Sequence, residues 1–181
     1  MIKILSSGLI EVDLDEHLLS ESEYYYNYHQ TNNKHSILKG KGNLAGYIGE
    51  QVFHAVFLDA VFANTYDYDF TWKGMKVDIK TKNRTVDGNL NHSASIAAYS
   101  PEKQDCDSYI FISLNKNNHK AWIMGGIRKH DFISKATLFK QGDNDPDFPA
   151  FTFPVNTYNL KYSELNQLGK YYRDIKIKEM G

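Results

Sequence analysis

Alternation of apolar and polar side chains predicts two adjoining strands in the first half of the chain. Apolar residues occupy every second position in Thr65–Trp72 and again in Met75–Lys82. That period is typical of strands with one apolar face. The two residues between the runs, Lys73 and Gly74, favour a tight turn. The sequence therefore predicts a β-hairpin.

A spacing of three to four residues between apolar side chains predicts a helix ahead of this hairpin. The helix covers Leu44–Leu58, and Asn43 is suited to cap its N-terminus. Gly46 and Gly49 each cost a helix roughly 1 kcal/mol relative to alanine. Two glycines within one turn indicate that another segment approaches the helix backbone closely. The apolar stripe consists of Leu44, Ile48, Val52, Ala55 and Val56.

The remaining segments have weaker patterns. Leu9–Leu14 fits a short edge strand, Thr31–Asn43 a polar loop, and Ala94–Tyr99 either a helix or a strand. The other expected elements are a helix over Glu16–Gln30, a hairpin formed by Ser108–Leu114 and Lys120–Met124, and helices over Lys129–Phe139 and Ser163–Tyr172. This order of elements predicts a mixed α/β sandwich.

Composition limits the class of protein. A chain of 181 residues that is 41% hydrophobic is expected to form one globular domain. We divide it into an N-terminal arm and helix (1–43), a core (44–139), and a C-terminal loop and helix (140–181). The formal net charge of −1 argues against a protein that coats nucleic acid through bulk positive charge.

The expected compartment follows from what the sequence lacks. A single cysteine, Cys106, excludes an intrachain disulfide and favours a reducing compartment. We find no pattern typical of a signal peptide and no apolar run long enough to span a bilayer. These features predict a cytoplasmic protein without a membrane partner.

The hairpin is expected to gather acidic side chains. With a two-residue turn, Asp69 lies across from Asp78 and Asp67 lies across from Lys80. Opposed carboxylates repel each other unless a cation lies between them. A few oxygen ligands supplemented by water and phosphate suit Mg²⁺ or Mn²⁺. We favour Asp69 over Asp67 as the central ligand, although a β-bulge at the turn would change this register.

Two further residues extend this candidate site. Lys80 leaves its strand on the same side as Asp78, where an ammonium group can orient an attacking water and stabilise charge on a phosphate. A metal ion there lowers the pKa of that water and polarises the phosphodiester. Glu50, on the glycine-containing helix, is placed to reach the same group of side chains.

Taken together, these residues resemble the PD-(D/E)xK nuclease superfamily, which includes restriction endonucleases, Holliday junction resolvases and phage exonucleases. The pattern is Gly46-x-x-Gly49-Glu50, then Asp69, then Asp78-Ile79-Lys80. The resemblance covers roughly residues 44–139. The compact layout and the lead Ser36-Ile37-x-x-Gly40 into Gly42-Asn43 are similar to uncharacterised phage proteins of this superfamily. One departure is Tyr68, which stands where the superfamily pattern has proline.

The resemblance implies a restriction-endonuclease-like αβ sandwich with a mixed central sheet, and Mg²⁺-dependent hydrolysis of DNA phosphodiester bonds. Glu50, Asp69 and Asp78 would hold the metal, the Ile79 carbonyl would complete its sphere, and Lys80 would be the catalytic lysine. A homodimer is compatible with this activity. The alternative is a catalytically inactive nuclease fold that binds nucleic acid or a protein partner.

Other candidates come from the charged residues around the site. His54, one turn after Glu50, is expected either to line the site or to pack in the core. The acidic run Asp143–Asp147 is predicted to be a solvated loop. Phosphate contacts position a nucleic acid without reading its sequence, and four cations are candidates for them: Lys39, Lys41, Lys82 and Arg84.

Overall fold

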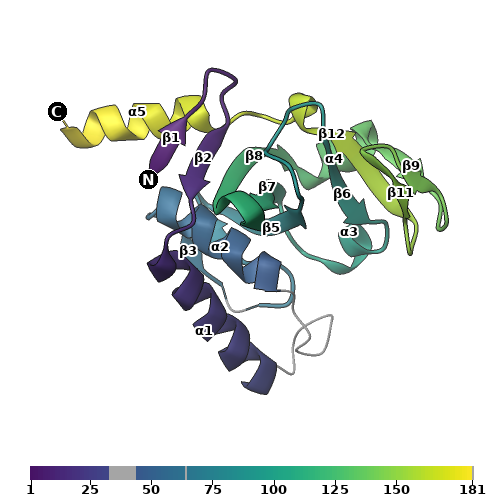
Figure 1. The fold of residues 1–181 in the computed structure, drawn as a ribbon, viewed down its shortest axis with the longest axis horizontal. Helices are drawn as coiled ribbons and strands as arrows, with labels where there is room; N and C mark the ends of the chain where they lie inside the picture. Colours follow the sequence, from purple (N-terminus) through teal and green to yellow (C-terminus); the bar gives the residue numbers. More distant parts are fainter. Residues whose placement is uncertain (33–43, 64, 181) are drawn as a thin grey trace.

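The computed structural model describes residues 1–32, 44–63 and 65–180, and its largest element is a seven-stranded mixed sheet (Figure 1). Only the β5–β7 pair is parallel; the other neighbouring strands are antiparallel. The predicted mixed α/β architecture is therefore confirmed. The strand order is β1 (Ile2–Ile4), β2 (Ile10–Asp13), β8 (Lys120–Arg128), β7 (Ser108–Asn115), β5 (Met75–Asn83), β4 (Phe70–Trp72) and β3 (Val61–Phe62).

Helices and a second, smaller sheet cover the large sheet. Helix α2 (Leu44–Val56) packs on one face with α1 (Glu16–Asn32) beside it, and α5 (Gly169–Met180) joins the same apolar cluster. Figure 1 shows α1 and α2 on one side of the molecule and the second sheet on the other. The elements of that other side are α3 (Ser100–Lys103), α4 (Lys129–Lys135), the sheet β6 (Ser93–Ala97)–β12 (Thr157–Lys161)–β9 (Thr137–Phe139), and the hairpin β10 (Asn144–Asp145)–β11 (Phe148–Thr152).

The two central strands supply side chains to two separate cores. Val77 and Ile79 of β5, with Ile110 of β7, belong to the cluster around α2. Tyr109 and Phe111 of β7 belong to the cluster around α4 and the second sheet. Alternate residues of a strand point to opposite faces. The even-numbered residues of β5 pair with Tyr109 and Phe111 of β7, so their side chains lie on the face that the second sheet covers.

The predicted hairpin forms with the expected register, but its first strand is shorter than predicted. Trp72 pairs with Met75, and Lys73 and Gly74 have φ of 52° and 74°, as a tight hairpin turn requires. Strand β4 begins only at Phe70. The Thr65 hydroxyl accepts hydrogen bonds from the backbone N–H groups of residues 67 and 68, at 3.3 and 3.1 Å. This local turn replaces strand pairing over residues 65–68.

Several other expectations need correction. Leu9–Leu14 is not an edge strand, because β1 pairs with the outer side of β2. The helix predicted over Lys129–Phe139 ends at Lys135, since the next residues pair with β12 as β9. The helix predicted over Ser163–Tyr172 begins only at Gly169; Asn166 exchanges two backbone hydrogen bonds with residue 126, which holds the chain extended. The undecided segment Ala94–Tyr99 is mostly strand β6.

The contact between α2 and β5 depends on Gly49. A Cβ atom at Gly49 would lie 1.9 Å from Thr81 Oγ1 and 3.1 Å from Thr81 Cβ, whereas a Cβ at Gly46 meets nothing within 4 Å. We expect Gly49→Ala to lower the free energy of unfolding by about 1–3 kcal/mol through overpacking. We expect Gly46→Ala to raise it by about 0.5–1 kcal/mol. Urea unfolding checks both; equal stability of the two variants would contradict the close contact.

Candidate functional site

Asp69 comes directly before β4, which begins at Phe70. Beyond this point the edge of β5 has no strand partner on the β4 side. The Asp69 backbone N–H donates to the Val77 carbonyl at 3.0 Å, which continues the hairpin by one step. Asp69 Oδ2 accepts a hydrogen bond of 2.7 Å from the Ile79 N–H. The carboxylate thus takes the place of a strand partner for β5. Its two contacts, with Val77 and Ile79, hold Asp69 beside Asp78, the residue between them.

Asp78 and Lys80 leave β5 on the same side and form an ion pair. Lys80 Nζ lies 2.6 Å from Asp78 Oδ2, and the Asp78 side chain is only 6% exposed. Lys80 Nζ also donates to Gln104 Oε1 at 3.3 Å and lies 5.8 Å from the centre of the Tyr109 ring. Asp78 Oδ2 is buried, and the Lys80 ammonium lies directly against it.

Glu50 completes this group, which we call the acid cluster: Glu50, Asp69 and Asp78. The neighbouring Gly49 allows α2 to approach β5 closely, which brings Glu50 to the strand. Burial, followed by the charge of Asp78, raises the pKa of Glu50 to about 8 against the opposing effect of Lys80. Burial and then the charges of Glu50 and Asp78 also raise the pKa of Asp69 well above its usual value. The three carboxylates therefore repel one another in a poorly solvated place.

Two neighbours of the acid cluster remain in their ordinary protonation states near neutral pH. Burial alone would lower the pKa of Lys80, but the Asp78 carboxylate raises it above its usual value, so Lys80 stays an ammonium. Burial, then Glu50 and Asp69, raise the pKa of Tyr47 to about 12, so it stays a neutral phenol. Sequence reasoning missed Tyr47, although it lies three residues before Glu50 and thus on the same helix face.

Asp67 has another role than the one predicted, and His54 takes one of its two predicted roles. Asp67 accepts a hydrogen bond of 3.3 Å from the Asp105 N–H. The expected pairing of Asp67 with Lys80 is therefore wrong, because residues 65–68 form a turn rather than a strand. His54 packs: its ring centre lies 4.8 Å from that of Phe62 and 6.0 Å from that of Phe70.

Lys82 and Arg84 are bound to the run predicted to be a solvated acidic loop. Lys82 Nζ lies 2.8 Å from Asp145 Oδ2, and an Arg84 guanidinium nitrogen lies 2.6 Å from Asp147 Oδ2. Asp145 is only 2% exposed, so the prediction of a solvated loop is wrong for these two acids. Their charges are already balanced, which makes Lys82 and Arg84 poor phosphate contacts. The other two candidate contacts, Lys39 and Lys41, lie outside the described residues, as does the predicted cap Asn43.

The acid cluster has the ligand chemistry of a hard cation, but its side chains face other partners. Among residues 1–32, 44–63 and 65–180, no three His, Cys, Asp or Glu side chains converge in ligand geometry. The reason lies in two contacts: Asp78 Oδ2 faces the Lys80 ammonium and Asp69 Oδ2 faces the Ile79 N–H. The positive charge of Lys80 is what offsets the acid cluster here.

Comparison with known proteins adds no family assignment. No protein-family model and no curated protein sequence matches this chain. In the part of the chain that the structure describes, no helix is both long and apolar enough to cross a membrane. Function is therefore inferred from the side chains around Asp78.

Proposed function

We propose that the protein is a metal-dependent nuclease of the PD-(D/E)xK type, with a restriction-endonuclease-like fold, that hydrolyses DNA phosphodiester bonds. One observation carries this proposal. Carboxylates from α2, from the start of the hairpin and from β5 are gathered near a partly buried lysine, Lys80. Such a cluster has no evident role in stability, because mutually repelling buried acids destabilise a fold.

The acid cluster fits a divalent cation. Its donors are carboxylate oxygens, which suit Mg²⁺ and Mn²⁺, and the buried Asp78 carboxylate faces a single ammonium, that of Lys80, among the described residues. Glu50, Asp69 and Asp78 would hold the ion, and the Ile79 carbonyl is the remaining candidate ligand. An ion bound there would lower the pKa of a water molecule and polarise a phosphodiester.

The protein's own contribution centres on Lys80. Asp78 and Gln104 contact its ammonium from two sides and hold it in place. Because its pKa is raised, Lys80 is protonated at neutral pH and is not a general base. A fixed positive charge of this kind stabilises the negative charge that develops on a phosphate during hydrolysis. We therefore assign Lys80 to charge stabilisation and to orientation of the attacking water.

The test is cleavage of four DNA substrates: supercoiled, linear duplex, single-stranded and branched. Each is incubated with the full-length protein in Mg²⁺, in Mn²⁺ and in excess chelator. The proposal expects cutting in the presence of either metal and none with chelator. If no substrate is cut under any condition while DNA is still bound, the protein is a binding module that retains the nuclease fold.

A further inference from the structure

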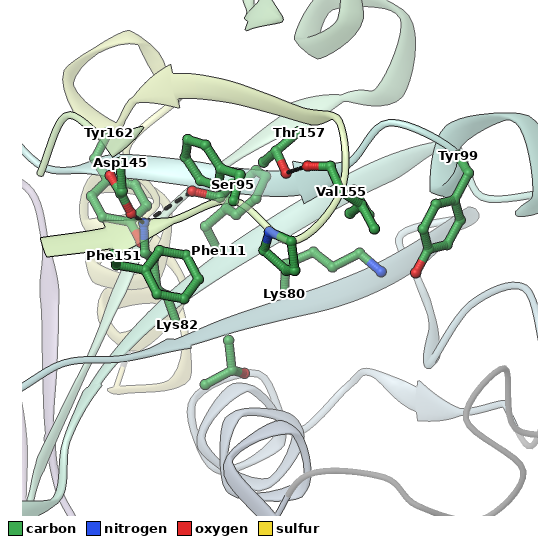
Figure 2. Close-up of a pocket in the computed structure, with 14 residues that line it drawn as sticks. Lys80, Lys82, Ser95, Tyr99, Phe111, Asp145, Phe151, Val155, Thr157 and Tyr162 are labelled. Carbon is green, nitrogen blue, oxygen red and sulfur yellow. Dashed lines mark hydrogen bonds and ion pairs between the residues drawn. The ribbon is translucent and has the colours of Figure 1, made fainter. Parts of the chain in front are cut away.

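A pocket of about 410 Å³ lies along β5 and shares Lys80 with the candidate site. Lys80 and Lys82 form its β5 side, and the second sheet with residues 151–155 forms the other side. Figure 2 shows the Lys80 side chain between Phe151 and Tyr99. Because Lys80 belongs to both the pocket and the candidate site, whatever fills the pocket lies next to the reacting phosphate.

The pocket is lined mainly by aromatic and apolar side chains. Phe111 and Tyr162 are almost fully buried within it, whereas Phe151 and Tyr99 are 44% and 40% exposed. Exposed flat rings beside an apolar cavity suit a flat, apolar partner, since aromatic rings stack on the faces of other rings. The shape and lining therefore favour a planar ring system.

The charges in the pocket argue against a phosphate as its occupant. Lys82 Nζ is bound to Asp145 Oδ2 at 2.8 Å and to Ser95 Oγ at 3.0 Å. A phosphate site needs cationic donors that are not already matched by carboxylates. Ser95, Asp145 and Thr157 also line the pocket. Their oxygen atoms already have hydrogen-bond partners, but a hydroxyl or carboxylate oxygen has more than one lone pair and can also accept from the N–H edge of an uncharged ring.

We propose that this pocket, the base pocket, receives one unstacked nucleobase of the strand being cut, next to the scissile phosphate. The inference rests on the proposed nuclease function and specifies its substrate. The pocket lies at the low end of the roughly 300–1,000 Å³ range of small-molecule sites, which suits one nucleoside. A base in a duplex must be unpaired and unstacked to enter. The preferred substrate is therefore DNA with an unpaired nucleotide at the cut, as in single strands, gaps and flaps.

Binding without catalysis tests the base pocket first. The full-length protein in chelator is titrated with a single-stranded oligonucleotide that carries the fluorescent base 2-aminopurine at successive positions. Phe151→Ala is expected to weaken binding by about 5- to 100-fold, the range for loss of one base-stacking ring. Phe148→Ala is the matched control: Phe148 lies on the same strand, is 61% exposed and does not line the pocket. Both variants remove exposed rings, and thermal melting verifies their folding.

Cleavage in Mg²⁺ then tests the substrate class. The wild type is expected to cut single-stranded DNA faster than duplex of the same sequence. One abasic nucleotide beside the cut should slow the wild type but not slow Phe151→Ala further. Equal binding by Phe151→Ala and Phe148→Ala, or no effect of an abasic nucleotide at any position, would overturn the base pocket. If binding depends on Phe151 but no DNA is cut, the base pocket stands and the nuclease function fails.

Discussion

Lys80→Ala is expected to slow metal-dependent DNA cleavage by at least about 100-fold, the usual cost of removing one group that stabilises charge in the transition state. The substitution removes the ammonium that contacts Asp78 and Gln104. Initial rates of cleavage at saturating Mg²⁺ measure the effect. Because the acid cluster would lose its internal cation, melting in Mg²⁺ must show that the variant is folded.

Lys76→Ala is the matched control for Lys80→Ala. Lys76 leaves the same face of β5 and is paired with an exposed acid, Asp105, at 2.6 Å. Exposed ion pairs contribute little to stability, so this variant should cleave at close to the wild-type rate. A folded Lys80→Ala protein that cuts as fast as the wild type would remove Lys80 from the mechanism.

Glu50→Gln is expected to stabilise the metal-free protein at mildly alkaline pH. The pKa of Glu50 is raised from 4.5 to about 8 in the folded state. Between these pH values the unfolded chain has lost this proton and the folded chain retains it, so stability falls as pH rises. The stabilising contribution is complete below about pH 4.5 and is lost by about pH 8. The loss is at most on the order of 5 kcal/mol, because each unit of the pKa difference between 4.5 and about 8 corresponds to about 1.4 kcal/mol.

Urea unfolding in chelator over this pH range measures the effect. The wild type should lose stability toward pH 8, while Glu50→Gln should lose less and be the more stable protein there; the slope that remains in the variant comes from Asp69, whose pKa is also raised. Adding Mg²⁺ at the alkaline end should raise the melting temperature of the wild type more than that of Glu50→Gln, because ligands stabilise the state that binds them. Glu164→Gln, at an exposed glutamate, is the control. Parallel pH profiles for wild type and Glu50→Gln would contradict the acid cluster.

The parts of the site that follow local rules could be predicted from the sequence. Asp78 and Lys80 share a face because strand side chains alternate, and the Lys73–Gly74 turn set the register of the hairpin. Gly49 indicated a close approach to the helix, which Thr81 makes. In each case the signal lies within a few residues of the feature that it predicts.

Contacts between distant segments could not be predicted. Gln104 reaches Lys80 because β5 and β7 pair in parallel, and the register of such a pair leaves no local signal. Asp145 looked like a loop residue, but it is buried against Lys82, 63 positions away in the chain. The Thr65 turn was missed because the alternating pattern of the following residues concealed it. The base pocket follows from the same distant pairings.

The most direct test of the acid cluster compares two neighbouring aspartates. Asp69→Asn and Asp67→Asn make the same chemical change two residues apart, but only Asp69 contacts β5 beside Asp78. Cleavage of single-stranded and supercoiled DNA is measured for both variants and the wild type in Mg²⁺ and Mn²⁺. The account predicts that wild type and Asp67→Asn cut with either metal, whereas Asp69→Asn does not. Cutting by Asp69→Asn at the wild-type rate, or no cutting by the wild type, would contradict it.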